Sequence, residues 1–219
     1  MKLTGSAESL RTLMEAVAIR MIDACDELSA LDRAMGDGDH GLNMKRGFEA
    51  VQNQVDSIAA RPLPEALKMI GMTMISKVGG ASGPIFGTLF TTLGKSLPAE
   101  PTLTEVAAAL DLAIAAIKRL GKAEPGMKTL LDVLVPVQIE LARTATESGI
   151  GSNVALVATP ASIAQRISRC AVQAADATAS LKSIRGRGSF LGDRSIGHVD
   201  PGARSSALII MTVCEVLAQ

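Results

Sequence analysis

Long segments in which apolar residues recur at helical spacing follow one another along the chain, and this periodicity restricts the fold most. It predicts eight helices, and no pair of strand-like segments intervenes. Their approximate bounds are Ser6–Leu31, Leu42–Ser57, Pro64–Val78, Pro84–Ser96, Leu103–Leu120, Thr129–Glu147, Pro160–Leu181 and Pro201–Leu217. Since no long linker, internal repeat or low-complexity segment separates them, we expect a single domain over residues 1–219.

The side chains available for a core favour the same fold class. The chain has four Phe and neither Trp nor Tyr, although 47% of its residues are hydrophobic. Pleated sheets favour β-branched and aromatic residues, whereas Ala, Leu and Met are strong helix formers. Small side chains also let helices approach closely. We therefore predict an all-α protein, built as an antiparallel up-and-down bundle.

Charge and cysteine content exclude several classes of protein. The 22 basic and 22 acidic residues are interspersed, which argues against nucleic-acid binding. No apolar run reaches the roughly 20 residues that span a bilayer, and residues 1–6 lack the apolar stretch of a signal peptide. Cys25, Cys170 and Cys214 lie far apart without metal-ligand spacing. These features predict a cytoplasmic protein with buried thiols and with no membrane or nucleic-acid partner.

The connections between the predicted helices are of two alternating kinds. Those after the first, third, fifth and seventh helices are glycine-rich and contain Gly36–Gly41, Gly79–Gly83, Gly126–Thr129 and Arg185–Gly202. In an up-and-down bundle alternate connections lie at the same end. The helices that begin there present unpaired N–H groups and the positive ends of their dipoles. We therefore expect an anion site at this end, most naturally for phosphate.

Three aspartates, Asp32, Asp37 and Asp39, lie within a span of eight residues at the first glycine-rich connection. Converging carboxylates repel one another unless a cation lies between them. Mg²⁺ is commonly held by a few carboxylates together with substrate phosphates. The alternative interpretation is a solvated turn, because Asp-Gly pairs are good turn formers.

Both histidines lie in these connections. His40 follows the aspartates, and His198 precedes the last helix. A loop histidine is often a hydrogen-bonded structural group. For His40, contact with phosphate oxygens or with a metal-bound water is the competing interpretation.

Four further polar residues have a capping or solvent interpretation beside a functional one. Asp200 before Pro201 is typical of a helix N-cap. Ser82 can cap the following helix or direct its hydroxyl to phosphate. Arg185 and Arg187 lie among glycines, as in a mobile cationic loop that covers a phosphate, or in a merely solvated loop.

The motifs in three of these connections resemble a known family. Leu31–Gly41, with its Gly-Asp-Gly-Asp-His-Gly run, Gly79–Pro84 and Gly192–Ala203 are similar to the dihydroxyacetone kinase L subunit. The same domain forms the nucleotide-binding half of ATP-dependent dihydroxyacetone kinases. The resemblance extends over essentially the whole chain, with several motifs in the same order.

The resemblance implies an eight-helix antiparallel barrel that binds ADP or ATP at one rim. It also implies that Asp32, Asp37 and Asp39 hold two Mg²⁺ ions and take part in catalysis through them. The nucleotide-binding positions carried over from the family are His40, Gly41, Leu42, Asn43, Ala81, Ser82, Gly126, Thr129, Leu130, Arg187 (or Arg185), Asp200, Pro201 and Gly202.

The implied reaction is phosphoryl transfer to dihydroxyacetone or a related short ketose, which a separate K subunit binds. The donor is either a phosphohistidine protein of the phosphotransferase system, with ADP as a bound coenzyme, or ATP. The alternatives are a nucleotide-sensing regulatory module without catalysis and a kinase subunit for another acceptor, such as erythrulose or a fatty acid. A homodimer is a further hypothesis.

The sequence departs from the family pattern in two loops. Met127 replaces the aspartate of the usual Gly-Asp-Lys-Thr, and Gly188 and Phe190 replace Ala and Tyr in the usual Gly-Arg-Ala-Ser-Tyr-Leu. Because the chain lacks Trp and Tyr, we expect aliphatic side chains such as Leu130 and Met127 to sandwich the adenine.

Overall fold

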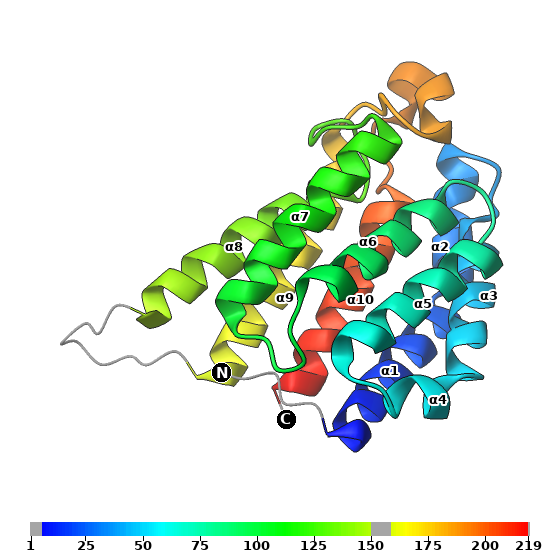
Figure 1. The fold of residues 1–219 in the computed structure, drawn as a ribbon. Coiled ribbons are helices and arrows are strands. Elements are labelled where there is room, and N and C mark those ends of the chain that lie inside the picture. Colours follow the sequence, from blue (N-terminus) through cyan, green and yellow to red (C-terminus); the bar gives the residue numbers. More distant parts are fainter. Residues whose placement is uncertain (1–5, 150–158, 219) are drawn as a thin grey trace.

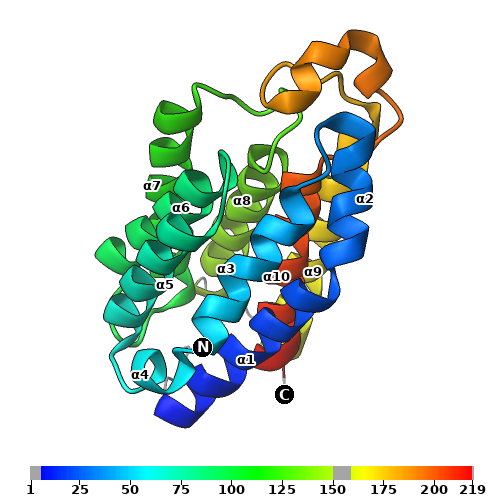
Figure 2. The same cartoon turned by 90° about the vertical axis from the view of Figure 1, so that its right-hand side faces the viewer.

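The structure is a computed structural model that describes residues 6–149 and 159–218, and within these ranges its regular elements are all helices. Long helices run up and down, each packing against the next, and the last packs back against the first, which closes a ring (Figures 1 and 2). The predicted all-α antiparallel barrel is thus confirmed. The elements are α1 Ala7–Asp23, α2 Cys25–Met35, α3 His40–Gln52, α4 Val55–Ala59, α5 Leu63–Lys77, α6 Ser82–Ser96, α7 Leu103–Gly121, α8 Leu131–Gly149, α9 Pro160–Ala177, α10 Pro201–Leu217, and the 3₁₀ segments η1 Thr178–Ser180 and η2 Arg187–Ser195.

The first predicted helix is two helices, which corrects the single span Ser6–Leu31. The break is at Ala24, whose ψ of 2° departs from helical geometry while its N–H still bonds to Arg20. Neither Gly nor Pro marks this position in the sequence. The second half, α2, continues to Met35, and Asp32 therefore lies in its last turn.

The second predicted helix, Leu42–Ser57, is also divided. It begins earlier, at His40, and α3 ends at Gln52. A turn at Asn53 and Gln54 then leads into the short α4, and Asn is a poor residue for a helix interior. The break lets Val55 and Ile58 bury their side chains, and α4 packs against α1.

Aliphatic and sulfur-containing side chains fill most of the core. Met21, Met44 and Met74 are fully buried, beside Phe48 and Phe86. Methionine has three rotatable side-chain bonds and fills irregular gaps where aromatic rings are scarce. An alanine- and methionine-rich core of this kind suits closely spaced helices.

The two ends of the barrel differ. Figures 1 and 2 show the start of α1, the end of α10 and α4 at one end, together with the connection from α6 to α7. The opposite end carries the connection from α2 to α3 and the 3₁₀ segment η2. The predicted alternation of connections is confirmed for the described residues, whereas the connection over residues 150–158 lies outside them.

None of the described helices combines the length and the apolar character that a membrane crossing needs. All three cysteines are free thiols: Cys25 and Cys214 are buried, and Cys170 is partly buried. Burial raises the pKa of the Cys214 thiol to about 12, so this thiol stays protonated and unreactive.

Candidate functional site

The four glycine-rich connections meet at one end of the barrel and line the same cleft. Its walls come from residues 37, 39–40, 79–82, 128–130, 185–188 and 200–202, together with Asp32 and a few other buried side chains. Helices α3, α6 and α10 begin in these walls, and α8 begins directly after Leu130. Free N–H groups and helix dipoles therefore point at the cleft, which favours an anion there.

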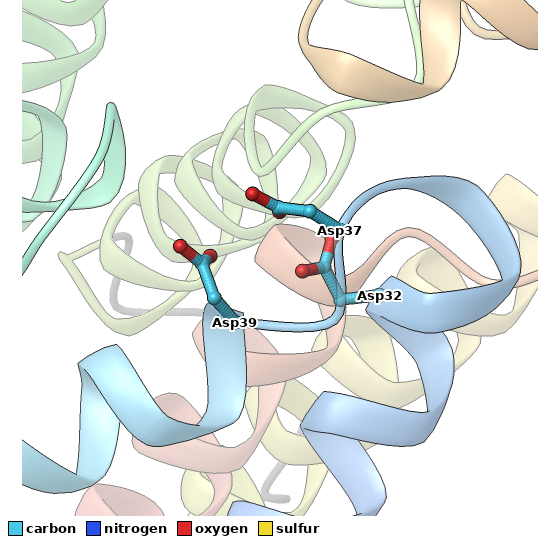
Figure 3. Close-up of side chains that lie close together, drawn as sticks. All are labelled: Asp32, Asp37 and Asp39. Atoms are coloured by element: carbon cyan, nitrogen blue, oxygen red, sulfur yellow. The ribbon is translucent and has the colours of Figure 1, made fainter.

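Asp32, Asp37 and Asp39 form a cluster at the edge of this cleft, and we call it the aspartate cluster. Each offers one carboxylate oxygen, and these oxygens all lie within 4.8 Å of one another. Figure 3 shows the three side chains projecting from the end of α2, from the α2–α3 loop and from the start of α3. Their oxygens face a common space beside the cleft.

The surroundings of the aspartate cluster favour its interpretation as a divalent-cation site over its interpretation as a solvated turn. Asp32 is 7% exposed, whereas a solvated turn would leave it in water. Its Oδ2 accepts a bond of 3.1 Å from the N–H of His40, which fixes one oxygen. Arg187 lies 2.5 Å from Asp37 and offsets part of the negative charge. Three hard oxygen donors of this kind suit Mg²⁺.

His40 is buried, and its ring joins three helices. Nδ1 lies 3.1 Å from the hydroxyl of Ser82 on α6, and Nε2 lies 3.1 Å from the hydroxyl of Ser205 on α10. Burial lowers the pKa of the imidazole, which favours its neutral form. This geometry supports the hydrogen-bonded structural role, although one edge of the ring still lines the cleft. His198 is exposed and does not line the cleft.

The two capping expectations have different outcomes. Asp200 caps α10 as predicted, because its Oδ2 accepts a bond of 2.7 Å from the N–H of Ala203, and Pro201 follows. The capping interpretation of Ser82 is wrong. Ser82 is the first residue of α6 rather than its cap, and the helix has no side-chain cap. Its hydroxyl turns to His40 because the ring lies within reach.

The carboxyl group of Asp200 has an unusual protonation equilibrium. Burial raises its pKa from 3.8 to about 7, although the N–H of Ala203 opposes the shift. The nearby Asp132 raises this pKa further, and Lys128 lowers it. A carboxyl group that changes charge near neutral pH thus lies in the wall of an anion site.

Asp200 should make the ligand-free protein less stable as the pH rises from about 4 to about 7. The raised pKa means that the folded state keeps a proton that the unfolded chain releases in this range. Asp200→Asn keeps a capping side chain but cannot ionise. Between pH 5 and pH 8, urea denaturation should show the variant gaining about 2 kcal/mol relative to the parent protein. Parallel pH profiles for the two proteins would contradict this assignment.

Asp193→Asn is the control of opposite sign. A hydrogen bond from Lys182 lowers the pKa of Asp193, so this exposed carboxyl contributes stability above its unfolded pKa and loses it on acidification. Its replacement should therefore reduce stability slightly at high pH, which separates the effect of Asp200 from a general effect of removing negative charge.

The long connection before α10 lies over the cleft. It contains the 3₁₀ segment η2 where a loop was predicted, and it brings Arg185, Gly186 and Arg187 into the cleft wall. Arg187, the preferred of the two predicted arginines, is the one that pairs with Asp37. The tip of this connection is open, because Phe190 is 90% exposed.

Lys128 in the cleft wall and Asp132 beside it were not predicted as site residues. Lys128 is 1% exposed and lines the cleft. Asp132 shapes the connection before α8, because its carboxylate accepts bonds from the N–H groups of Gly126 (2.5 Å) and Thr129 (2.7 Å). The three-residue spacing from Thr129 to Asp132 resembles a capping pattern and is a usable signal. The burial of Lys128 has no comparable signal in the sequence.

The predicted nucleotide-binding residues divide into two groups. Those that line the cleft are His40, Ala81, Ser82, Thr129, Leu130, Arg187, Asp200, Pro201 and Gly202. Those outside its lining are Gly41, Leu42, Asn43 and Gly126. Gly41 packs against α2, and Leu42 is 56% exposed. Met127 is also outside the lining, whereas Leu130 is part of it. Contact of either group with a nucleotide stays a prediction.

Comparisons with known proteins agree with this geometry. The family model described as the DAK2 domain matches residues 34–215. Over 194 residues the chain is 45% identical to the "PEP-dependent dihydroxyacetone kinase, ADP-binding subunit DhaL" of Escherichia coli (strain K12), covering 87% of this chain and 86% of the relative. It is 38% identical to the "PEP-dependent dihydroxyacetone kinase 1, ADP-binding subunit DhaL" of Listeria innocua, covering 83% and 82%.

A solved structure has the same fold. The dihydroxyacetone kinase from C. freundii, crystallised in complex with AMP-PNP and Mg²⁺, superposes with a TM-score of 0.73 at 23% sequence identity. The match covers 97% of this chain but 34% of that longer chain.

Proposed function

The chain belongs to the DAK2 domain family, and we propose that it is the ADP-binding subunit of a dihydroxyacetone kinase that passes a phosphoryl group to a short ketose held on a separate K subunit. The observation that carries the proposal is the aspartate cluster, whose oxygens lie within 4.8 Å of one another beside the N-termini of three helices. The names of the two bacterial relatives support ADP as the nucleotide and a phosphoenolpyruvate-dependent donor.

The residues of the cleft have separate tasks in this proposal. Asp32, Asp37 and Asp39 hold two Mg²⁺ ions, and the N–H groups at the starts of α3, α6 and α10 bind phosphate oxygens. Arg187 lies close enough to the aspartate cluster to reach the same phosphates. Leu130 supplies apolar contact for the base. When bound, ADP would supply the acceptor for the phosphoryl group of the donor protein before that group passes to the ketose, and Mg²⁺ would neutralise its charge.

The proposed partners follow from the proposed kinase function. The K subunit approaches the end of the barrel that carries the cleft, and a phosphohistidine donor of the phosphotransferase system reaches the same end in turn. The reducing cytoplasm is the compartment that suits three free thiols. The chain forms one domain in this proposal, and a homodimer is a separate hypothesis that light scattering tests.

Calorimetry tests the nucleotide site directly. ADP should bind at least about 100-fold more tightly in Mg²⁺ than in EDTA, because the aspartate cluster repels phosphate unless cations lie between them. Equal affinity in the two buffers, or no binding in either, would contradict the proposal. Slow release of ADP supports the coenzyme mode, and fast exchange supports ATP as the donor.

Turnover with a K subunit separates the kinase from its alternatives. Phosphoenolpyruvate-dependent phosphorylation of dihydroxyacetone in the reconstituted system is the expected result. Tight ADP binding without any turnover would instead indicate a nucleotide-sensing module. Turnover with erythrulose alone would assign a different acceptor to the same site.

A further inference from the structure

Lys128 has an unusual environment for a lysine. Its side chain is 1% exposed, and its backbone has a φ of 61°, in the left-handed region. Its Nζ donates bonds to two main-chain carbonyls, those of Leu181 (3.0 Å) and Ser195 (2.7 Å). A buried ammonium is costly unless it is hydrogen-bonded or paired. Burial lowers its pKa, and the charge of Asp200 raises it.

The two carbonyls belong to the first and last residues of the segment that covers the cleft. We call this segment, residues 181–195, the cover segment. Further anchors lie at the same two ends. The N–H of Ser183 donates to the hydroxyl of Ser195 (2.9 Å), and this hydroxyl donates to the carbonyl of Gly192 (2.7 Å). The N–H of Ile184 donates to the carbonyl of Met127 (3.1 Å). One lysine thus joins both ends of the cover segment to the connection before α8.

The middle of the cover segment carries the groups that face the cleft. Arg185 and Arg187 line it, and Arg187 pairs with Asp37. The tip has little support of its own, since Phe190 is 90% exposed and the ion pair of Lys182 with Asp193 is exposed. The position of Arg187 therefore depends on the anchors at the two ends together with the packing of η2 against α2.

We propose that Lys128 is a positioning residue that clamps both ends of the cover segment, so that Arg187 faces the aspartate cluster and the nucleotide phosphates. The effect of Lys128 on the nucleotide passes through Arg187. The inference rests on the proposed function, because that function supplies the phosphates that Arg187 meets.

Hydrogen exchange of the ligand-free protein tests the clamp without any nucleotide. Lys128→Met removes the ammonium group and keeps the aliphatic stem. We expect the amides of Ser183 and Ile184 to exchange at least about tenfold faster, because their anchoring segment loses two charge-assisted bonds, while α3 keeps its protection. Unchanged exchange in the cover segment would overturn the proposal.

A double-variant cycle tests whether Lys128 acts through Arg187. Lys128→Met and Arg187→Met should each weaken binding of ADP with Mg²⁺ by about tenfold or more. The double variant should bind no more weakly than Arg187→Met alone. Additive losses would show that Lys128 acts by another route and would overturn the proposal.

Two further variants keep the test decisive. Lys182→Met is the matched control, because this exposed lysine lies on the cover segment itself, and neither amide exchange nor affinity for ADP should change by more than about twofold.

If Lys128→Met does not fold, Ser195→Ala removes the hydroxyl that links Ser183 to Gly192, and it should raise the exchange of the same amides. If the parent protein does not bind ADP, the proposed function fails, and the exchange result still decides on the clamp.

Discussion

Asp37→Asn should reduce phosphoryl transfer by at least about 100-fold and leave the fold unchanged. Asparagine keeps the size of the side chain and removes one of the three charges proposed to hold the cations, and the loss of such an electrostatic group typically costs about 10²–10³ in rate. Asp37 lies in an exposed loop, so the melting temperature should stay close to that of the parent protein. The measurement is kcat/KM in the reconstituted kinase, with calorimetry of ADP in Mg²⁺ beside it.

The matched control for Asp37→Asn is Asp26→Asn. Asp26 is an exposed carboxylate on α2, the helix that also carries Asp32, but it lies at the opposite end of that helix. Activity in this control should stay within about twofold of the parent protein. If Asp37→Asn retained more than half of the activity, the aspartate cluster would have no role in transfer.

Gly41→Ala should cause the largest loss of stability. A Cβ at Gly41 would lie 2.0 Å from the carbonyl oxygen of Cys25 and 2.7 Å from the N of Ser29, both in the backbone of α2. The two helices would have to separate, and forced overpacking of this kind costs about 2 kcal/mol or more. In a chain of this length that lowers the melting temperature by roughly 4–8 °C.

The same variant should also weaken Mg²⁺ binding. Asp32 lies at the end of α2 and Asp39 directly before α3, so separating the two helices widens the aspartate cluster. Gly121→Ala is the control, since the atom nearest to its Cβ would be 3.9 Å away. Thermal denaturation and Mg²⁺ titration measure both effects. A melting temperature for Gly41→Ala within about 1 °C of the parent protein would refute the close-approach argument.

The fold was largely predictable because its signals are local. Helical periodicity, Pro201 after Asp200 and the glycines of the connections each depend on a few neighbouring residues. The break at Ala24 escapes such signals, and the break at Asn53 has only the weak signal of an Asn within a helix, so the packing of α2 and α4 against neighbouring helices decides them. Tertiary contacts override weak local preferences at these points.

The candidate site was predictable only in part, for a related physical reason. Asp32, Asp37 and Asp39 lie close together in the sequence, and one short loop is enough to bring them together. The partners of His40 are Ser82 and Ser205, which are 42 and 165 residues away. The partners of Lys128 lie 53 and 67 residues away. No local pattern reports contacts that only the closed barrel creates.

The placement of the two ends of the chain makes this barrel a portable module. Helix α1 begins and α10 ends at the end of the barrel remote from the aspartate cluster (Figure 1). A polypeptide joined at either point therefore leaves access to the cleft unobstructed. This freedom is compatible with fusion to other domains, and in the superposed kinase from C. freundii the matching part is 34% of a longer chain. For the experimenter, affinity tags and fluorescent fusions belong at this end.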